Sequence, residues 1–353
     1  MSKVALVSGV TGVVGRRLTL HLAALPDWRV IGFARRAAAA DLPGVEVHSV
    51  DLTSRDAIRA AIARCAGISH IFHCARYDHS TDRPEPVDIN TAMLVELVEA
   101  VEDAGHPLAH VHLVQGSKYY GSNLGRYRTP AREDHPRSLQ SNFYFEQEDY
   151  CIARQGRRRW TWSANRPHAI CDRAPGIARS LPMVIAVYAA ISKELGAPLC
   201  FPGTVANFHA IYQCTDAQHL AKAITWMATT PACANQAFNI TNGDFIRWEH
   251  LWPGFARGFG MEFGGVLTTP LGKVMADKGA VWDRIVRKYD LVPTRFEQVA
   301  LWPYADFIFT PHWDMMSDTS KARRFGFPDV VDTEAMFHDM WAGFRAARII
   351  PPS

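Results

Sequence analysis

The stretch "KVALVSGVTGVVGRRLTLHLAAL", residues 3–25, gives the first indication of how this chain folds. It begins with an apolar run typical of a buried strand and ends with apolar residues at the spacing of an amphipathic helix. Between them stand Gly9, Gly12 and Gly15, a G-x-x-G-x-x-G loop. Glycines let a backbone turn sharply and approach a pyrophosphate, while the helix N-terminus directs free N–H groups at the phosphates. This order predicts a dinucleotide-binding unit, against the alternative of a chance turn.

The segments that follow repeat the alternation of strand and helix. Short apolar runs predict further strands, and apolar residues at helical spacing separate most of them. The predicted strands are residues 29–35, 45–50, 70–75, 110–116 and 160–167. Such alternation is typical of an α/β fold in which helices cover both faces of a parallel sheet. The sequence therefore predicts a Rossmann domain with a doubly wound parallel sheet.

The end of the second predicted strand indicates which dinucleotide is favoured. An NAD site commonly has an acid there, but this chain has Arg35 and Arg36. A guanidinium can bind a 2′-phosphate through charge-assisted, often bidentate hydrogen bonds. NADPH is therefore favoured over NADH, with two solvated surface arginines as the alternative. Asp51 and Leu52, after the third strand, are expected at the adenine, although an aspartate there is also a common cap.

After Pro167 the pattern changes to helices separated by loops rich in proline and glycine. We predict helices near residues 182–194, 216–229, 247–258 and 333–346, and a strand at 236–240. We expect this part to form a smaller, mostly helical lid that rests on the strand ends. The predicted division is an NADP-binding Rossmann domain over residues 1–170 and, over 171–353, mainly a substrate-binding lid with some segments returning to the Rossmann core.

Composition limits the class of protein. The net charge of +3 over 353 residues is too weak to indicate a nucleic-acid surface. The longest apolar run, residues 181–191, is too short to cross a bilayer, and the chain opens as a strand instead of a signal peptide. Seven cysteines form no C-x-x-C pair, so we expect reduced core cysteines of a cytoplasmic protein and no metal site.

A hydride-transfer enzyme of the short-chain type usually pairs a tyrosine with a lysine four residues later. Tyr144 lies where such an acid is expected, but position 148 is Glu148, and none of the ten tyrosines has that lysine. Tyr150 is followed by Arg154 and is a minor rival, since arginine is an inferior substitute for tuning a phenol.

Lys118 is the better partner for Tyr144. It follows the fifth predicted strand, and in a doubly wound sheet the carboxyl ends of the strands face the ligand crevice. Tyr144 begins the next predicted helix, so both side chains can reach the same crevice. The alternative is a surface lysine and a packing tyrosine, and composition alone does not separate the two interpretations.

Two motifs carry a more specific signal. "QGSKYYG" (115–121) and "NFYFEQED" (142–149) resemble the signatures of the progesterone 5β-reductase/iridoid synthase-like (PRISE) family, an atypical branch of the short-chain dehydrogenases/reductases. The likeness continues in "WTWSANRP" (160–167) and "QAFNITNGDFIRWEHLWP" (236–253), so it spans nearly the whole chain.

The resemblance implies NADPH-dependent 1,4-reduction of the C=C bond of a small-molecule enone or enal, in a possible homodimer. Tyr144 would hold the carbonyl oxygen as it gains enolate character, and Lys118 would give electrostatic support. The α-carbon would take its proton from solvent. The expected cofactor contacts are Gly9, Thr11, Gly12, Val13, Val14, Gly15, Arg35, Arg36, Asp51, Leu52, Gln115, Tyr144, Pro167 and Ile170.

The sequence departs from the family pattern around the expected substrate pocket. Phe145 stands where a second tyrosine is usual, Cys74 or a neighbour replaces a tryptophan, and Ala169 replaces an asparagine. Leu124 stands where an aromatic residue is expected. With Tyr120 and His168 these residues form the predicted pocket, so the reaction type is better supported than steroid or iridoid substrates.

Two other functions remain open at this point. The protein could reduce a carbonyl or epimerise a nucleotide sugar, as other extended short-chain enzymes do, although the missing tyrosine–lysine spacing argues against this. It could also be a non-catalytic scaffold that senses NADP, although keeping both Lys118 and Tyr144 argues against that.

Overall fold

A parallel sheet forms the centre of the computed structural model, which describes residues 3–37, 42–78, 85–174 and 178–353. Within these residues the sheet has seven strands in the order β10-β6-β5-β4-β1-β2-β3. Their bounds are β1 (Lys3–Ser8), β2 (Trp28–Ala34), β3 (Glu46–Ser49), β4 (His70–His73), β5 (His110–Val114), β6 (Thr161–Arg166) and β10 (Gln236–Asn239). The order 3-2-1-4-5-6 is that of doubly wound dinucleotide-binding folds, so the predicted fold class is confirmed.

Strand β1 lies in the middle of the sheet, and this explains its nearly continuous apolar sequence. It pairs in parallel with β2 and β4, and Leu6 stands opposite Ile31 on one side and Ile71 on the other. A central parallel strand is covered on both faces and needs apolar residues at successive positions. The chain order reverses between β1 and β4, and ligands of such sheets bind outside the carboxyl ends of the strands at that point.

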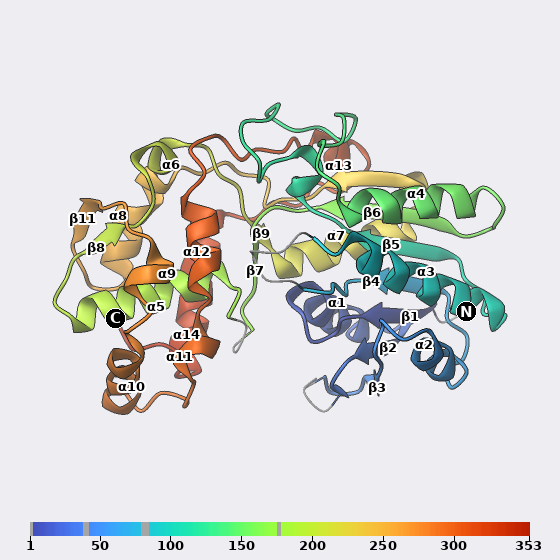
Figure 1. Cartoon of the computed structure of the whole chain (residues 1–353), viewed down its shortest axis with the longest axis horizontal. Helices are drawn as coiled ribbons and strands as arrows, with labels where there is room; N and C mark the ends of the chain where they lie inside the picture. The colour runs from blue at the N-terminus through green and yellow to red at the C-terminus, as the bar shows by residue number, and fades with distance from the viewer. Residues whose placement is uncertain (1–2, 38–41, 79–84, 175–177) are drawn as a thin grey trace.

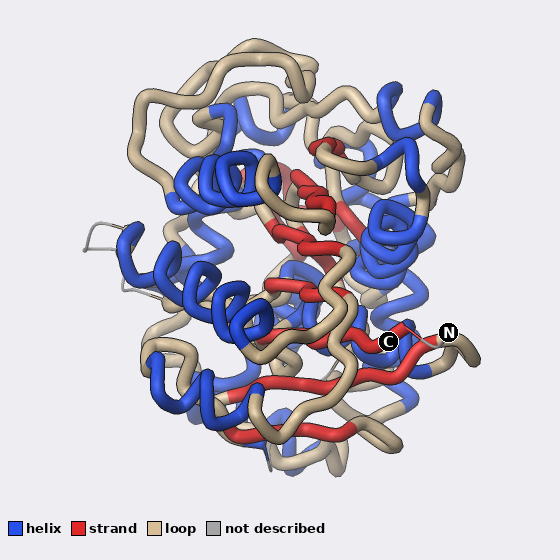
Figure 2. Tube along the Cα trace, turned by 90° about the vertical axis from the view of Figure 1, so that its right-hand side faces the viewer, coloured by secondary structure: helices blue, strands red, loops and turns tan. Residues whose placement is uncertain are grey.

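Helices cover both faces of the sheet (Figures 1 and 2). One layer contains α1 (Val13–Ala23) and α7 (Ala217–Thr229), which pack against each other. The other contains α2 (Arg55–Ile62), α3 (Val87–Asp103) and α4 (Phe143–Gln155). Both α7 and β10 come from the second half of the chain, which therefore returns to the sheet after forming part of the lid.

The rest of the second half forms a separate helical body beside the strand ends (Figure 1). Among the described residues, none of the helices is both long enough and apolar enough to span a bilayer. The helices of this body are α5 (Leu181–Glu194), α6 (Val205–His209), α8 (Trp248–Gly258), α9 (Leu271–Val274), α10 (Gly279–Lys288), α11 (Phe296–Val299), α12 (Trp302–Phe309) and α14 (Thr333–Ala346). The short helix α13 (Ser320–Arg324) instead packs on the sheet against β10. Short strand pairs join β8 (Leu199–Phe201) to β11 (Phe263–Val266) and β7 (Ile170–Cys171) to β9 (Thr215–Asp216).

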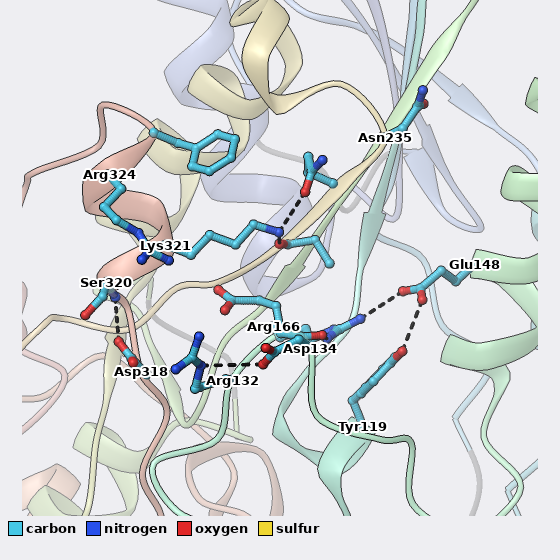
Figure 3. Close-up of a pocket in the computed structure, with 14 residues that line it drawn as sticks. Tyr119, Arg132, Asp134, Glu148, Arg166, Asn235, Asp318, Ser320, Lys321 and Arg324 are labelled. Carbon is cyan, nitrogen blue, oxygen red and sulfur yellow. Dashed lines mark hydrogen bonds and ion pairs between the residues drawn. The ribbon is translucent and has the colours of Figure 1, made fainter.

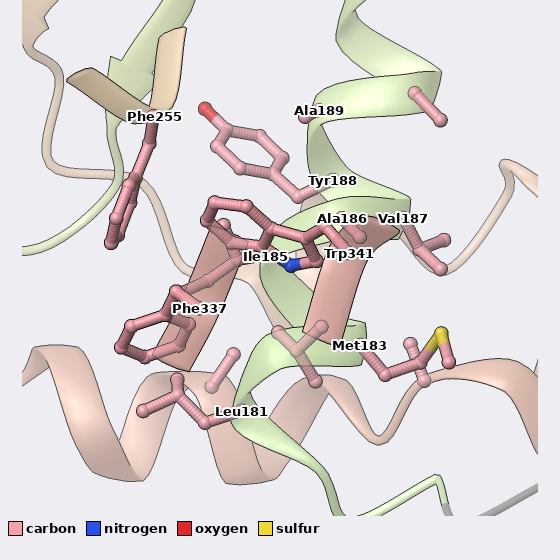
Figure 4. Close-up of a cluster of buried hydrophobic side chains, with 14 of the residues drawn as sticks. Leu181, Met183, Ile185, Ala186, Val187, Tyr188, Ala189, Phe255, Phe337 and Trp341 are labelled. Atoms are coloured by element: carbon pink, nitrogen blue, oxygen red, sulfur yellow. The ribbon is translucent and has the colours of Figure 1, made fainter. Parts of the chain in front are cut away.

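Helix α5 is the centre of this body. It starts after Ser180 with a proline in its first turn, a position where the missing N–H has no cost, and its residues are buried from Leu181 to Ser192. Aromatic side chains of α8 and α14 pack around it, with the rings of Phe255 and Trp341 4.7 Å apart (Figure 4). Trp248 and Trp252 of α8 are fully buried in this core.

Histidines on the central strands form a buried polar ladder. His110 Nε2 and His112 Nδ1 both lie 2.8 Å from the Ser163 hydroxyl, and His73 Nδ1 lies 3.1 Å from the Ser8 hydroxyl. These contacts satisfy the neutral imidazoles of His110 and His112 without solvent, whereas Nε2 of His73 is buried without a partner among the described residues. Burial lowers the pKa of His70 and His73 to about 4 and that of His112 to about 3.

We expect the free energy of unfolding to fall when the pH is lowered from 7 to 5. Unfolded histidines take up protons below about pH 6.5, whereas His70, His73 and His112 stay neutral in the folded protein, so stability is lost from pH 6.5 down to about 4. The loss is on the order of 2 kcal/mol for each histidine. Urea unfolding at both pH values measures it.

The control separates buried from exposed histidines. His73→Gln should reduce the pH dependence, whereas His250→Gln should not, because the His250 side chain is 71% exposed. Equal stability of the wild type at pH 7 and pH 5 would contradict the prediction.

Candidate active site

The glycine loop has the close contacts that a pyrophosphate cradle requires. Gly9 follows β1 with a φ of 73°, in the left-handed region. A Cβ at Gly9 would lie 2.8 Å from Ala75 Cα, and one at Gly15 would lie 2.3 Å from the Gly9 carbonyl oxygen. Helix α1 begins at Val13, and no side chain caps its first N–H groups. The loop therefore leaves free donors and the positive end of the helix dipole for an anion.

A cavity of about 500 Å³ begins at this loop and follows the carboxyl ends of β1, β2 and β4. It contains six residues predicted as cofactor contacts and one, Cys74, predicted for the substrate pocket. Its lining is Gly9, Thr11, Gly12, Phe33, Ala34, Arg35, Val50, Asp51, Leu52, Thr53, Cys74, Ala75, Arg76, Tyr77, Asp78 and Met93. The Asp51 carboxylate lines the cavity and accepts hydrogen bonds from Thr53 N and Oγ1, which lower its pKa, whereas the cap of α2 is Ser54.

The other predicted cofactor contacts lie around this cavity or beyond it. Arg36 is exposed next to Arg35, and Val13 and Val14 are half-buried in the first turn of α1. The Pro167 carbonyl accepts a hydrogen bond from Ser117 N at 3.1 Å. Ile170 in β7 packs against the core between α1 and α7.

Tyr144 lies in the first turn of α4, and its local contacts fix it there. The Asn142 side chain caps the helix by accepting a hydrogen bond from Tyr144 N at 3.0 Å. A Cβ on Gly116 would be 3.3 Å from the Tyr144 hydroxyl oxygen, so the phenol lies over the β5 exit loop where that residue has no side chain. Burial raises the pKa of the phenol, and the positive charge of Arg76 opposes this rise. Among the described residues, the hydroxyl has no hydrogen-bond partner.

Lys118 lies two residues beyond Gly116, in a short 3₁₀ helix, η2 (Ser117–Tyr120). Its ammonium lies 5.9 Å from the centre of the Phe307 ring, which belongs to α12 of the lid. Burial lowers the pKa of Lys118, and Glu85 opposes this shift.

The structure brings Tyr144 and Lys118 into one region. The phenol oxygen of Tyr144 lies at Gly116, and Lys118 follows on the same loop. The charges of Arg76, Arg179 and Glu85 contribute to the pKa shifts of both side chains. The Tyr144 hydroxyl and Lys118 therefore both lie at the loop that follows β5, with no hydrogen bond between them among the described residues.

The Glu148 side chain is held in a buried ionic network (Figure 3). Its carboxylate accepts hydrogen bonds from Arg166 Nη2 at 3.1 Å and from Gln115 Nε2 at 2.9 Å. It also accepts one from the Tyr119 hydroxyl at 3.1 Å. Gln115 donates to the Tyr144 carbonyl as well, so the side chain that we predicted as a cofactor contact fastens β5 to α4.

Three other residues predicted for the substrate pocket, Tyr120, Phe145 and Leu124, do not lie together in one cavity among the described residues. The Tyr120 hydroxyl donates to Asn239 at 2.7 Å and accepts from Arg166, and Phe145 packs on Tyr119 with ring centres 5.1 Å apart. Leu124 is 56% exposed.

His168 and Ala169 lie behind the same loop. His168 Nδ1 is 2.7 Å from the Ser117 hydroxyl, its Nε2 is buried without a partner among the described residues, and burial lowers its pKa to about 4. Ala169 has a φ of 36°, an uncommon value for a residue with a side chain.

Tyr150, the alternative to Tyr144, lies against the hydrophobic core. Tyr150 packs partly buried against the core under α3 and α4, and its buried hydroxyl has no partner among the described residues. Arg154 binds Glu99 at 3.0 Å and Glu102 at 2.6 Å. Arg154, four residues after Tyr150, is thus held in ion pairs with α3.

Comparison with known proteins places the chain in a family. The model of the PRISE-like Rossmann-fold domain matches residues 8–351. The chain belongs to this family. Among curated PRISE-like relatives, (S)-8-oxocitronellyl enol synthase from Antirrhinum majus is 34% identical, with 99% of this chain and 93% of the relative covered. The 3-oxo-Delta(4,5)-steroid 5-beta-reductase from Arabidopsis thaliana is 31% identical at the same coverage. The predicted resemblance is confirmed, and the protein is an oxidoreductase.

Solved structures share the fold of this PRISE-like chain at low identity. A short-chain dehydrogenase/reductase superfamily protein from Agrobacterium tumefaciens with bound NAD has a TM-score of 0.67 at 18% identity, and each chain is 98% covered. UDP-glucose 4-epimerase from Thermus thermophilus in complex with NAD has a TM-score of 0.66 at 15% identity, with 98% of this chain and 99% of the epimerase covered.

Proposed function

We propose that this protein reduces the activated C=C bond of an enone or enal with NADPH. The observation that carries the proposal is the Tyr144 hydroxyl lying over the β5 exit loop that also bears Lys118, although position 148 holds a glutamate bound elsewhere. The relatives are named for enol synthesis and for steroid 5β-reduction, and both names fit hydride addition to a conjugated double bond.

The residues of the cavity fit a nicotinamide dinucleotide. Gly9, Gly12 and the first turn of α1 would hold the pyrophosphate, and the loop can keep this tight path because a Cβ at Gly9 or Gly15 would clash with neighbouring backbone. Arg35 lines the cavity where the 2′-phosphate would lie and favours NADPH. When bound, the nicotinamide supplies a hydride for the β-carbon of the substrate.

Tyr144 would act as a hydrogen-bond donor to the substrate carbonyl. Because burial raises its pKa, the phenol stays protonated at neutral pH. As the electron pair of the C=C bond moves toward the carbonyl, the oxygen becomes negative and the hydrogen bond strengthens. The positive charge of Lys118 stabilises the same oxygen at longer range, and the α-carbon takes a proton from solvent.

Carbonyl reduction is the second candidate, since a phenol can equally well hold a developing alkoxide. The residue at position 148 argues against carbonyl reduction. One helical turn after the tyrosine, where the usual lysine would stand, the chain has Glu148, which is buried and bound to Arg166. The two reactions give different products from one enone: a saturated ketone or an allylic alcohol.

The test is NADPH consumption with a panel of enones and enals, followed by product analysis. We expect saturated carbonyl products from 2-cyclohexen-1-one and related compounds, and a lower KM for NADPH than for NADH. Allylic alcohols would favour carbonyl reduction, and tight NADPH binding with no turnover of any member would favour a non-catalytic scaffold.

A further inference from the structure

Arg76 is a charged residue at the edge of the cofactor cavity. It follows β4 and lines the cavity, next to Ala75, which is the residue that approaches Gly9. Its guanidinium acts on both Tyr144 and Lys118. The side chain is 27% exposed, and among the described residues only its Nη2 has a hydrogen-bond partner. The guanidinium therefore has free donors at the edge of the cofactor cavity, and its Nε is buried without a partner among the described residues.

The carboxylates near Arg76 do not neutralise the cations of the crevice. Arg76 Nη2 is 3.0 Å from Glu85 and 3.8 Å from Asp78, and Asp78 is also 3.8 Å from Arg179. Lys118 adds a third positive charge that feels all four of these groups. Among the described residues in this cluster, three cations face two carboxylates. A partly buried site with one surplus positive charge favours an anionic ligand.

Aromatic rings of the lid lie against two of these cations. The Arg179 guanidinium lies 5.3 Å from the Tyr304 ring centre, and Lys118 lies 5.9 Å from the Phe307 ring centre. Both rings belong to α12. The walls thus offer apolar faces for a carbon skeleton, while the charge lies on the side of the β4 exit loop.

We propose that the substrate is an enone or enal that carries a carboxylate, and that Arg76 binds this carboxylate. The inference rests on the proposed function and names its substrate class. A guanidinium with free donors forms charge-assisted, often bidentate hydrogen bonds with a carboxylate, so Arg76 can orient the double bond as well as attract the molecule.

The surplus charge has a competing explanation, because the reaction itself creates a negative oxygen. If Arg76 served only that oxygen, or only the cofactor, its loss would lower the rate with neutral and with anionic substrates alike. A carboxylate subsite would instead change the ratio between them.

A matched acid and ester separate these explanations. The probes are (E)-4-oxopent-2-enoate and its methyl ester, which share one enone skeleton. We expect Arg76→Met to lower the ratio of kcat/KM for the acid over the ester about 10- to 100-fold relative to the wild type. Using the ratio cancels the different intrinsic reactivity of the two compounds and any general loss of activity.

A second variant keeps the test valid if Arg76→Met folds poorly. Glu85→Gln removes a neutralising carboxylate and should raise the acid-to-ester ratio. Unchanged ratios in both variants, with enones still reduced, would overturn the inference and leave the proposed function standing. Failure of the wild type to reduce any enone would remove the proposed function and this inference with it.

Discussion

Replacing Tyr144 with phenylalanine is expected to lower kcat/KM for an enone about 100- to 1,000-fold, the usual cost of one lost oxyanion donor. The phenol would be the hydrogen-bond donor to the oxygen that becomes negative. The aromatic ring and the Asn142 cap remain in the variant, so the helix should keep its position. Steady-state kinetics with 2-cyclohexen-1-one and NADPH measure the effect.

The same substitution should leave stability nearly unchanged. The Tyr144 hydroxyl has no hydrogen-bond partner among the described residues, so its removal breaks no internal contact there. Thermal unfolding of the variant therefore checks that lost activity reflects chemistry alone.

Tyr150→Phe is the matched control. This hydroxyl is also without a partner among the described residues, but it lies in the core beneath α3, away from the crevice. We expect its activity to equal that of the wild type. Full activity of Tyr144→Phe, or loss of activity in Tyr150→Phe instead, would contradict the assignment.

The sequence predicted the fold because it follows from topology, and the same topology supports the prediction that Tyr144 and Lys118 act at one edge of the sheet. Parallel strands place their exits on one edge, so a residue after β5 and one at the start of α4 must approach each other. The glycine loop could be predicted equally well, since its regularly spaced glycines lie between a predicted strand and a predicted helix.

The side-chain partners of the site were not predictable in the same way. Gln115 could be placed near the crevice, but not which of its neighbours it would bind. The cluster of Arg76, Glu85 and Arg179 comes from two loops, whose paths depend on tertiary packing and leave no spacing signal in the sequence. The Asn142 cap, in contrast, carries a recognisable signal, an asparagine directly before a helical pattern.

Position 148 is where the sequence misleads most easily. A lysine there would restore the usual spacing after Tyr144, and a sequence comparison alone suggests that Glu148→Lys should repair an incomplete site. The structure predicts the opposite result. Glu148 is 8% exposed and binds Arg166, which is 2% exposed, while Arg137 Nη2 lies 3.2 Å from the same carboxylate.

We expect Glu148→Lys to lower the free energy of unfolding by at least about 3–5 kcal/mol, the cost of leaving a buried charge without its partner. The lysine would add a third positive charge beside Arg166 and Arg137, so the actual loss should exceed that of simple removal. Urea unfolding measures it, and no gain in carbonyl reduction is expected.

Glu146→Lys is the control for a charge reversal on the same helix. Glu146 is exposed in the first turn of α4, where a negative charge favours the helix dipole by about 0.3–1 kcal/mol, so only a loss of about that size is expected. If Glu148→Lys were as stable as Glu146→Lys, the carboxylate would not anchor Arg166. The side chain at position 148 would then be free to turn toward the crevice, and the usual tyrosine–lysine arrangement would be within reach of this chain by a single substitution.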